Sequence, residues 1–246
     1  ARNAFDQAIT SARRDPQLLG SVLAILAASQ GEQAALQRAE QLVQAEPDNR
    51  IAKLVLARRL LAADRFDEAA KLARSLLQNP TDNKDRLGAL EILAGVNYRR
   101  GNYTACQGYY EQMLAIDPEN VFAANNLAYL LAEHLGKPQE ALPYAEKAVR
   151  LLPYDANVLD TLGWIYVLLK RFDRGIGILL QAIEFDPQAA GAHYHLAEAY
   201  RRRNRAADRD SAIREIRLAY KLSQQAGNST LQQQIEQTLK ALGIAP

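Results

Sequence analysis

Apolar residues recur along most of this chain at intervals of three or four, which is the spacing of helices that bury one face. Ala, Leu, Gln, Glu and Arg, which are strong helix formers, are abundant, whereas the chain has only 13 Gly, 5 Phe and one Trp. The pattern therefore predicts an all-α protein. Short breaks divide the helical segments into pairs, and the breaks are marked by Gly31, Asp64, Gly101, Gly136 and Lys170.

Prolines divide the chain into periods of similar length. They are Pro16, Pro47, Pro80, Pro118, Pro153 and Pro187, with spacings of 31, 33, 38, 35 and 34 residues. The residue before a proline avoids the helical region, so a helix ends there, and the Asp or Asn that often follows can cap the next helix. We therefore expect one helix pair per period, with a short first period and a long third one.

Small residues recur at matching places in these periods. The first helix of each pair carries a Leu followed by a small residue, as in Leu56-Ala57, Leu93-Ala94, Leu127-Ala128, Leu162-Gly163 and Leu196-Ala197. Small side chains let two helices approach closely, while larger ones such as Tyr166 and Tyr200 fill the space beside them. Such a pattern favours helices that pack pair against pair.

These features together resemble the tetratricopeptide repeat (TPR) family. The resemblance covers nearly the whole chain and is carried best by Asn125 to Pro153 and by Leu159 to Pro187. It implies an all-α fold, a right-handed α-α superhelix of about six helix pairs with one continuous core. In such a solenoid the first helices line the inner face.

The same resemblance implies a single solenoid over 1–246. We expect a half-repeat at 1–15, repeats at 16–49, 50–83, 84–120, 121–155, 156–189 and 190–227, and a capping helix at 228–246. The segment 2–14 matches the second helix of a repeat, which suggests a fragment of a longer solenoid, with a solitary capping helix as the alternative. The apolar stripe expected of the final helix consists of Leu231, Ile235, Leu239 and Leu242.

A search for catalytic and metal-binding motifs finds none that chemistry supports. The sequence has no Gly-rich phosphate loop, no His-Glu-x-x-His and no Gly-x-Ser-x-Gly. His193 and His195 are two apart and point in different directions on a helix, and His195 with Glu198 supplies only two ligands. Cys106, the single cysteine, occupies a small packing position, which favours a buried inert thiol. We therefore expect no enzyme activity, no cofactor and no metal.

The remaining candidate for function is the inner face. Asn can hydrogen-bond a partner's backbone, and Tyr and Trp combine apolar area with a polar tip. We expect a partner protein to contact Arg58, Tyr98, Asn125, Asn126, Tyr129, Glu133, Asp160, Trp164, Tyr194 and His195. The alternative for the aromatic rings is that they pack against the neighbouring repeat.

One subtype of the family is excluded at this stage. Co-chaperone TPR domains hold a C-terminal carboxylate with Lys and Asn at set places of successive inner helices. Those places carry Glu91, Gly95, Asn126, Asn157 and Thr161, of which only Asn126 agrees. A carboxylate clamp is therefore not expected.

Charge is uneven along the chain, although the net charge is only +2. The segment 201–221 holds eight bases and three acids, and the basic patch that it predicts consists of Arg201, Arg202, Arg203, Arg205 and Arg209. The patch is either a docking site for an acidic partner, an anionic polymer or a nucleic acid, or a solvated loop. Because no aromatic-rich basic groove accompanies it, nucleic-acid binding is not favoured.

The sequence thus predicts a non-catalytic scaffold that presents a curved groove to another protein. Leu18 to Ala28, the longest apolar stretch, is 11 residues, whereas a membrane span needs about 20. The stretch from Asn125 to Tyr200 also resembles bacterial TPR proteins of envelope assembly and exopolysaccharide export, which implies the periplasm or envelope, with the cytoplasm as the alternative. Three alternatives stay open: a regulatory segment of a larger enzyme such as a glycosyltransferase, binding of an anionic polymer or nucleic acid through Arg201 to Lys221, and homo-oligomers formed through the solenoid ends.

Overall fold

The computed structural model describes residues 2–78, 82–241 and 243–244, and the described residues are almost entirely helical. The chain divides into two compact units, at 1–118 and 119–246, which are treated separately below. Pro80 and Leu242, which the sequence singles out, lie outside the described residues.

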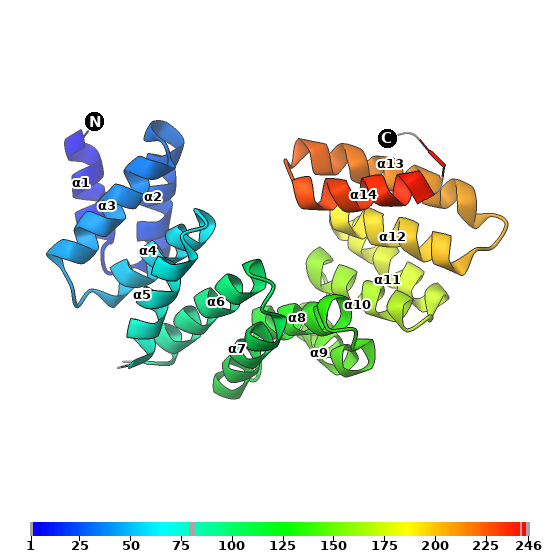
Figure 1. The fold of residues 1–246 in the computed structure, drawn as a ribbon, viewed down its shortest axis with the longest axis horizontal. Helices are drawn as coiled ribbons and strands as arrows, with labels where there is room; N and C mark the ends of the chain where they lie inside the picture. The colour runs from blue at the N-terminus through cyan, green and yellow to red at the C-terminus, as the bar shows by residue number, and fades with distance from the viewer. Residues whose placement is uncertain (1, 79–81, 242, 245–246) are drawn as a thin grey trace. The chain divides into compact units, whose positions relative to one another are not determined.

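Unit 1 (1–118) contains seven α-helices among its described residues (Figure 1). They are α1 (Arg2–Ala12), α2 (Pro16–Gln30), α3 (Glu32–Ala45), α4 (Arg50–Ala62), α5 (Phe66–Gln78), α6 (Asn83–Arg99) and α7 (Tyr103–Ile116). The helices α2 to α7 form three hairpins, and α1 packs on α2 as a leading helix. Along the unit, α2 contacts α4 and α4 contacts α6, so the first helices of successive hairpins stack on one another.

Unit 2 (119–246) contains seven further α-helices among its described residues and one π-helical segment, η1. They are α8 (Val121–Tyr129), η1 (Leu130–His134), α9 (Pro138–Leu151), α10 (Ala156–Leu168), α11 (Phe172–Phe185), α12 (Ala190–Arg203), α13 (Asp208–Gln225) and α14 (Ser229–Ala241). The first helices α8, α10 and α12 again contact one another in order, and α14 lies beside α13 (Figure 1). The all-α prediction with six helix pairs, a leading helix and a final helix is confirmed.

Side-chain caps fix where five of the first helices begin, whereas α12 begins without one. Asn49, Asn120 and Asp155 each accept a hydrogen bond from the backbone N–H three residues ahead, at 2.9–3.0 Å. Asp15 and Asp82 cap α2 and α6 in the same way. Each cap satisfies a backbone donor that the first turn of a helix leaves open. The predicted capping role of Asp and Asn is therefore confirmed.

The short first period has a different cause from the one the proline spacing suggests. Pro16 is the first residue of α2, directly after its cap Asp15, whereas Pro47 precedes the cap Asn49 by two residues. A proline is tolerated at this position because the first helical N–H has no helical acceptor. The caps Asp15 and Asn49 are 34 residues apart, so the first period has the ordinary length and the expectation of a short one is wrong.

The longer periods keep their helical phase in two ways. α6 has 17 residues against 13 in α4. Its cap Asp82 lies 11 residues before Leu93, whereas the cap of α4, Asn49, lies 7 before Leu56. The difference is about one helical turn. In the period of 35 residues, η1 continues α8, and Leu135 N–H bonds to the Leu130 carbonyl at 3.1 Å. Such an i→i+5 turn holds one extra residue without ending the helix.

The hairpin of α10 and α11 is closed by two glycines. A Cβ on Gly175 would lie 2.9 Å from the carbonyl oxygen of Gly163 and 2.8 Å from Val167 Cγ2, and a Cβ on Gly163 would lie 2.7 Å from Leu179 Cγ. Real Cβ atoms do not approach backbone oxygen this closely, so the two helices would have to separate. The small residue predicted at position 163 therefore sets the distance between α10 and α11.

We expect Gly175→Ala to destabilise unit 2 by about 1–3 kcal/mol, since the methyl group overpacks the contact between the two helices. Gly177→Ala on the same helix is the matched control, because an added Cβ there has no neighbouring atom within 4 Å. That change should raise stability by about 0.5–1 kcal/mol, as the helix loses a flexible residue. Urea unfolding followed by circular dichroism measures both, and equal effects would show that α10 and α11 are not in close contact.

Candidate functional site

Five of the predicted inner-face residues come together on the first helices of unit 2. Trp164 of α10 donates its indole N–H to Glu133 Oε2 of η1 at 2.7 Å, and its ring stacks on His195 of α12 with centroids 4.5 Å apart. His195 Nδ1 lies 2.7 Å from Asp160 Oδ1, and the Tyr194 ring lies 5.6 Å from the His195 ring. These contacts join η1, α10 and α12 side chain to side chain.

Trp164 is a structural link in this cluster and is largely closed to solvent. Trp164 is only 3% exposed, and the Arg202 guanidinium lies 4.7 Å from the centroid of its ring. The ring therefore packs against the neighbouring repeat, as the alternative interpretation of the sequence proposed. His195 is also buried, whereas Asp160 and Tyr194 are half-buried.

The next three predicted residues lie on α8. Asn125, Asn126 and Tyr129 are all half-buried, and Asn126 Nδ2 donates to the Phe122 carbonyl at 2.7 Å. The Tyr129 ring meets the His134 ring edge-on at 5.7 Å. Asn125 Oδ1 is buried and has no hydrogen-bond partner among the described residues. The Asn125 amide oxygen is therefore a polar group of this helix that the described residues leave unsatisfied.

The remaining two predicted residues belong to unit 1. Arg58 pairs with Glu91 on the next first helix at 2.8 Å, and Tyr98 meets Tyr103 edge-on at 5.8 Å. Arg58 is exposed and Tyr98 is half-buried. These side chains lie on α4 and α6, the counterparts in unit 1 of the first helices just described.

A buried carboxylate in unit 2 organises three side chains around it. Glu198 of α12 is 2% exposed and accepts two hydrogen bonds from Arg201, at 2.8 Å each, and one from Arg202 at 3.1 Å. Thr238 of α14 donates to the same carboxylate at 3.2 Å. Burial alone would raise the pKa of Glu198, but the two arginines hold it below its usual value. Glu198 thus fixes the last helix against α12.

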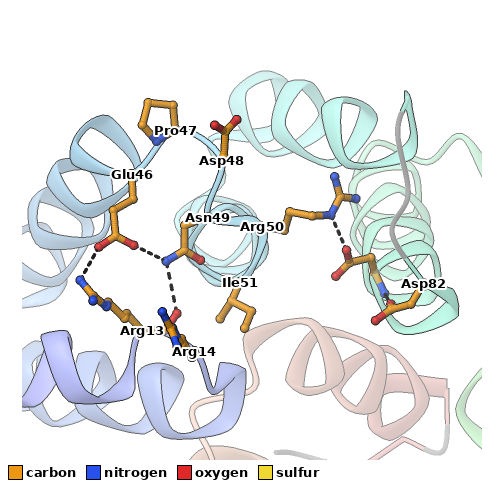
Figure 2. A pocket seen from close by; sticks show the side chains of 10 residues that line it. Arg13, Arg14, Glu46, Pro47, Asp48, Asn49, Arg50, Ile51 and Asp82 are labelled. Atoms are coloured by element: carbon orange, nitrogen blue, oxygen red, sulfur yellow. Dashed lines mark hydrogen bonds and ion pairs between the residues drawn. The ribbon is translucent and has the colours of Figure 1, made fainter.

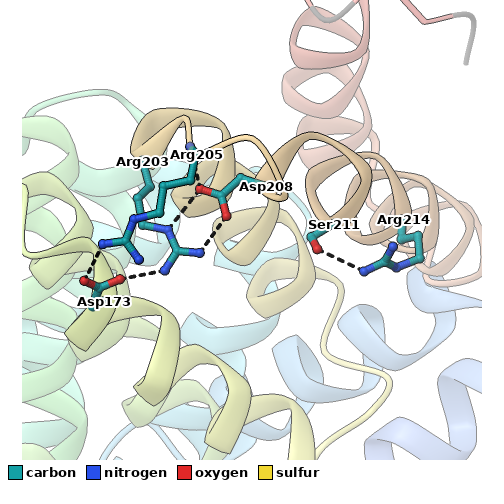
Figure 3. A network of polar contacts seen from close by, with 6 residues as sticks. All are labelled: Asp173, Arg203, Arg205, Asp208, Ser211 and Arg214. Atoms are coloured by element: carbon teal, nitrogen blue, oxygen red, sulfur yellow. Dashed lines mark hydrogen bonds and ion pairs between the residues drawn. The ribbon is translucent and has the colours of Figure 1, made fainter.

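The predicted basic patch is largely neutralised (Figure 3). Arg201 and Arg202 pair with Glu198, and Arg203 and Arg205 pair with Asp173 at 2.6 and 2.9 Å. Arg203 also pairs with Asp208, which is 3% exposed and accepts the backbone N–H of Arg205. Of the five residues, Arg209 alone has no ion-pair partner among the described residues. The other four are paired with acids of the same unit, which reduces the positive charge that the patch presents.

The arrangement of stacked helix hairpins agrees with the comparison to protein families. Tetratricopeptide repeat models match residues 109–142, 23–84 and 161–222, which together are well over half of the chain. The chain belongs to the TPR family.

A curated relative is the TPR repeat-containing protein PA4667 of Pseudomonas aeruginosa, 27% identical over 185 residues. The aligned region is 74% of this chain and 30% of that protein, so the chain spans less than a third of the relative's length. No more than family membership follows from this match.

Similar solved structures include two that are described as TPR proteins. A thermophilic TPR protein of Thermus thermophilus is 25% identical, with a TM-score of 0.59 over 77% of this chain and 98% of that one. YrrB, described as a TPR protein with an unusual peptide-binding site, is 18% identical with a TM-score of 0.56, over 81% of this chain and 97% of that one. PilW, a type IV pilus biogenesis factor, is 18% identical with a TM-score of 0.61, over 79% and 93%. These likenesses show the fold.

The structure also shows basic residues that the sequence analysis missed. Lys170, Arg171 and Arg174 lie at the turn between the two helices of one TPR repeat, and they line an open pocket of about 440 Å³ with Arg203 and Arg205. The available signal was the run Lys170-Arg171 with Arg174 one turn later. The pattern predicts Lys170 only as the turn position of the repeat, and nothing in the sequence brings Arg203 and Arg205 to it.

A larger pocket, of about 660 Å³, lies in unit 1 among the turns that join successive TPR repeats (Figure 2). Four of its charged side chains form two ion pairs: Arg13 pairs with Glu46 at 2.7 Å, and Arg50 pairs with Asp85. Asn49 donates to Glu46 at 2.8 Å and to the Arg13 carbonyl at 3.3 Å. The pocket therefore consists of contacts that hold neighbouring turns together.

Other chemistry is limited within the described part of the chain. No group of three His, Cys, Asp or Glu side chains is placed to hold a metal there. Burial raises the pKa of the Cys106 thiol to about 11, so the sulfur is protonated and unreactive at neutral pH. Among the described helices, none combines the length and apolar character that crossing a membrane requires.

We expect Glu133→Ala to lower the stability of unit 2 by about 1–3 kcal/mol, because it leaves the buried Trp164 N–H without its acceptor. The chain has one Trp, so tryptophan fluorescence reports this position directly. Glu184→Ala, an exposed change on α11, should alter stability by less than about 0.5 kcal/mol and leave the emission spectrum unchanged. An unchanged spectrum in Glu133→Ala would contradict the contact.

The acid dependence of stability tests the Arg203–Asp208 pair. Hydrogen bonds from Arg203 lower the pKa of Asp208 from 3.8 to about 2, so the folded state gains stability above pH 4 and loses it as pH falls toward 2. We expect Asp208→Asn to cost about 1–3 kcal/mol at pH 7 and progressively less between pH 4 and 2.

Asp210→Asn is the control for this measurement, since Asp210 lies exposed in the same first turn of α13. Denaturant midpoints at a series of pH values distinguish the two variants. The same pH dependence in both would show that Asp208 is not held by Arg203.

Proposed function

We propose that the chain is a protein-interaction scaffold whose contact surface is formed by the first helices of unit 2. TPR folds support interaction with protein partners in general. The observation that carries the more specific proposal is the side-chain cluster of Glu133, Asp160, Trp164 and His195, which locks three successive first helices to one another. A surface built on such links is already ordered before a partner arrives, and this lowers the entropy loss on binding.

The partner is expected to contact half-buried residues beside this cluster, since Trp164 and His195 themselves are closed to solvent. We call these residues the rim of the cluster: Asn125, Asn126, Tyr129 and Tyr194. Asn125 and Asn126 of α8 offer amide groups, and Tyr129 and Tyr194 offer rings with polar tips. Amide side chains bond extended backbone irrespective of its sequence, and tyrosines are common at the centres of interfaces. An extended peptide segment of a partner protein fits this combination, and the peptide-binding site named for YrrB supports it by analogy.

The finer part of the proposal concerns the cellular role. We infer recruitment of a component of a bacterial envelope or polysaccharide-export assembly. Two similarities support this role: the curated relative is bacterial, and PilW, whose fold this chain shares, is a pilus biogenesis factor.

Site-specific photo-crosslinking in cells that carry the gene tests the surface and the role together. With p-benzoylphenylalanine in place of Tyr129, we expect a crosslink to one partner protein, because the side chain lies at the rim of the cluster. The matched control replaces Tyr154, a tyrosine 74% exposed on the turn between α9 and α10, and should not capture that partner.

Three outcomes separate the parts of the proposal. Capture from position 129 alone supports the surface, and mass spectrometry of the captured protein then decides whether it belongs to an envelope or export assembly. Equal capture from both positions would place the contact elsewhere. Capture of a cytoplasmic enzyme would contradict the export role and leave the surface intact.

A further inference from the structure

Two neighbouring turns of unit 2 form a basic pocket that is separate from the proposed contact surface. One is the turn between α10 and α11, which supplies Lys170, Arg171 and Arg174. The other follows α12 and supplies Arg203 and Arg205, which both bond to Asp173 on the first turn of α11 (Figure 3). We call the lining of this open space of about 440 Å³, which comprises Lys170 to Arg174 with Arg203 and Arg205, the arginine pocket.

The arginine pocket carries an excess of positive charge that the fold does not neutralise. Five of its side chains are cations and one, Asp173, is an anion. Both carboxylate oxygens of Asp173 are occupied by Arg203 and Arg205, and these bonds hold its pKa below the usual value. Lys170, Arg171 and Arg174 have no ion-pair partner among the described residues. The pocket therefore has three cations available to an incoming anion.

Two of these cations are held in place by an aromatic ring. The guanidinium groups of Arg174 and Arg171 lie 4.4 and 6.0 Å from the ring of Tyr166, which is fully buried. The Tyr166 hydroxyl donates to Glu146 at 2.8 Å, which fixes the ring. A guanidinium that is oriented before binding loses less freedom when it bonds an anion, and its planar fork matches a carboxylate.

We propose that the arginine pocket binds an acidic segment of a partner protein, through carboxylates that bond Arg171 and Arg174. Guanidinium groups form bidentate pairs with carboxylates, which suits a ligand with Asp or Glu side chains. The cations of the arginine pocket are gathered where two neighbouring turns meet and do not form a row. A nucleic acid needs a row of phosphate contacts, so a peptide fits the pocket better.

Fluorescence anisotropy of a labelled (Asp-Glu)₄ octapeptide with the full chain tests this inference. We expect the variant Lys170→Gln, Arg171→Gln, Arg174→Gln to bind at least tenfold more weakly at physiological salt. The matched control is Arg209→Gln, Arg217→Gln, Lys221→Gln, which removes the same three charges from exposed positions on α13. It should change the affinity less than twofold, because these three side chains do not line the arginine pocket.

A milder variant separates the guanidinium fork from charge alone. The double variant Arg171→Lys, Arg174→Lys keeps the charge, and its affinity for the octapeptide should lie between those of the wild type and the glutamine variant. An (Asn-Gln)₄ peptide should not bind, and circular dichroism confirms that each variant is folded.

The inference is overturned if the octapeptide does not bind, or if the control variant weakens binding as much as the pocket variant. It is also overturned if an oligo-thymidine strand displaces the octapeptide and binds more tightly, which would assign the pocket to nucleic acid. Because the test uses no inner-face residue, its failure leaves the proposed scaffold function untouched.

Discussion

The packing of helix pairs in this protein depends on small side chains, which allow two helices to approach closely. Gly163 and Gly175 bring α10 and α11 together, and buried alanines such as Ala69 and Ala73 of α5 do the same in unit 1. An amphipathic hairpin alone leaves apolar surface in water, so each pair must pack on the next one to bury it. The stacking of first helices on first helices follows from this requirement, and the functional surfaces rest on it.

The polar groups of unit 2 lie where this stacking places them. Glu133, Trp164 and His195 come from three different repeats, about one period apart in the sequence, and they meet because successive first helices are neighbours. Burial of Glu198 is possible because Arg201 and Arg202 follow it within a turn and neutralise it. The buried Glu198 is thus paired within the fold, whereas three cations of the arginine pocket have no ion-pair partner among the described residues.

Much of the fold could be predicted from the sequence, because proline, cap and small-residue positions act locally. The fourteen helices and their pairing follow from these signals. The position of Pro16 within α2 does not follow from them, since a proline next to an Asp fits either side of a helix start.

The candidate site was harder to predict than the fold. The spacing placed Trp164 on the first helix of its pair but could not show that His195 and Arg202 would cover its ring. Likewise, the arginines between 201 and 205 predict a basic patch, but their pairing could not be predicted because Asp173, which bonds two of them, lies some thirty residues earlier.

The segment Leu130–His134 has a consequence for how such a chain tolerates changes in length. On a regular helix one added residue rotates everything after it by about 100°, which would point Glu133 away from the indole of the following repeat. A wider turn absorbs the addition locally, just as the extra turn at the start of α6 absorbs four residues at once. The directions of the side chains after the insertion are thereby preserved. The number of residues per repeat can therefore vary while the geometry between the inward-facing groups of successive repeats stays the same.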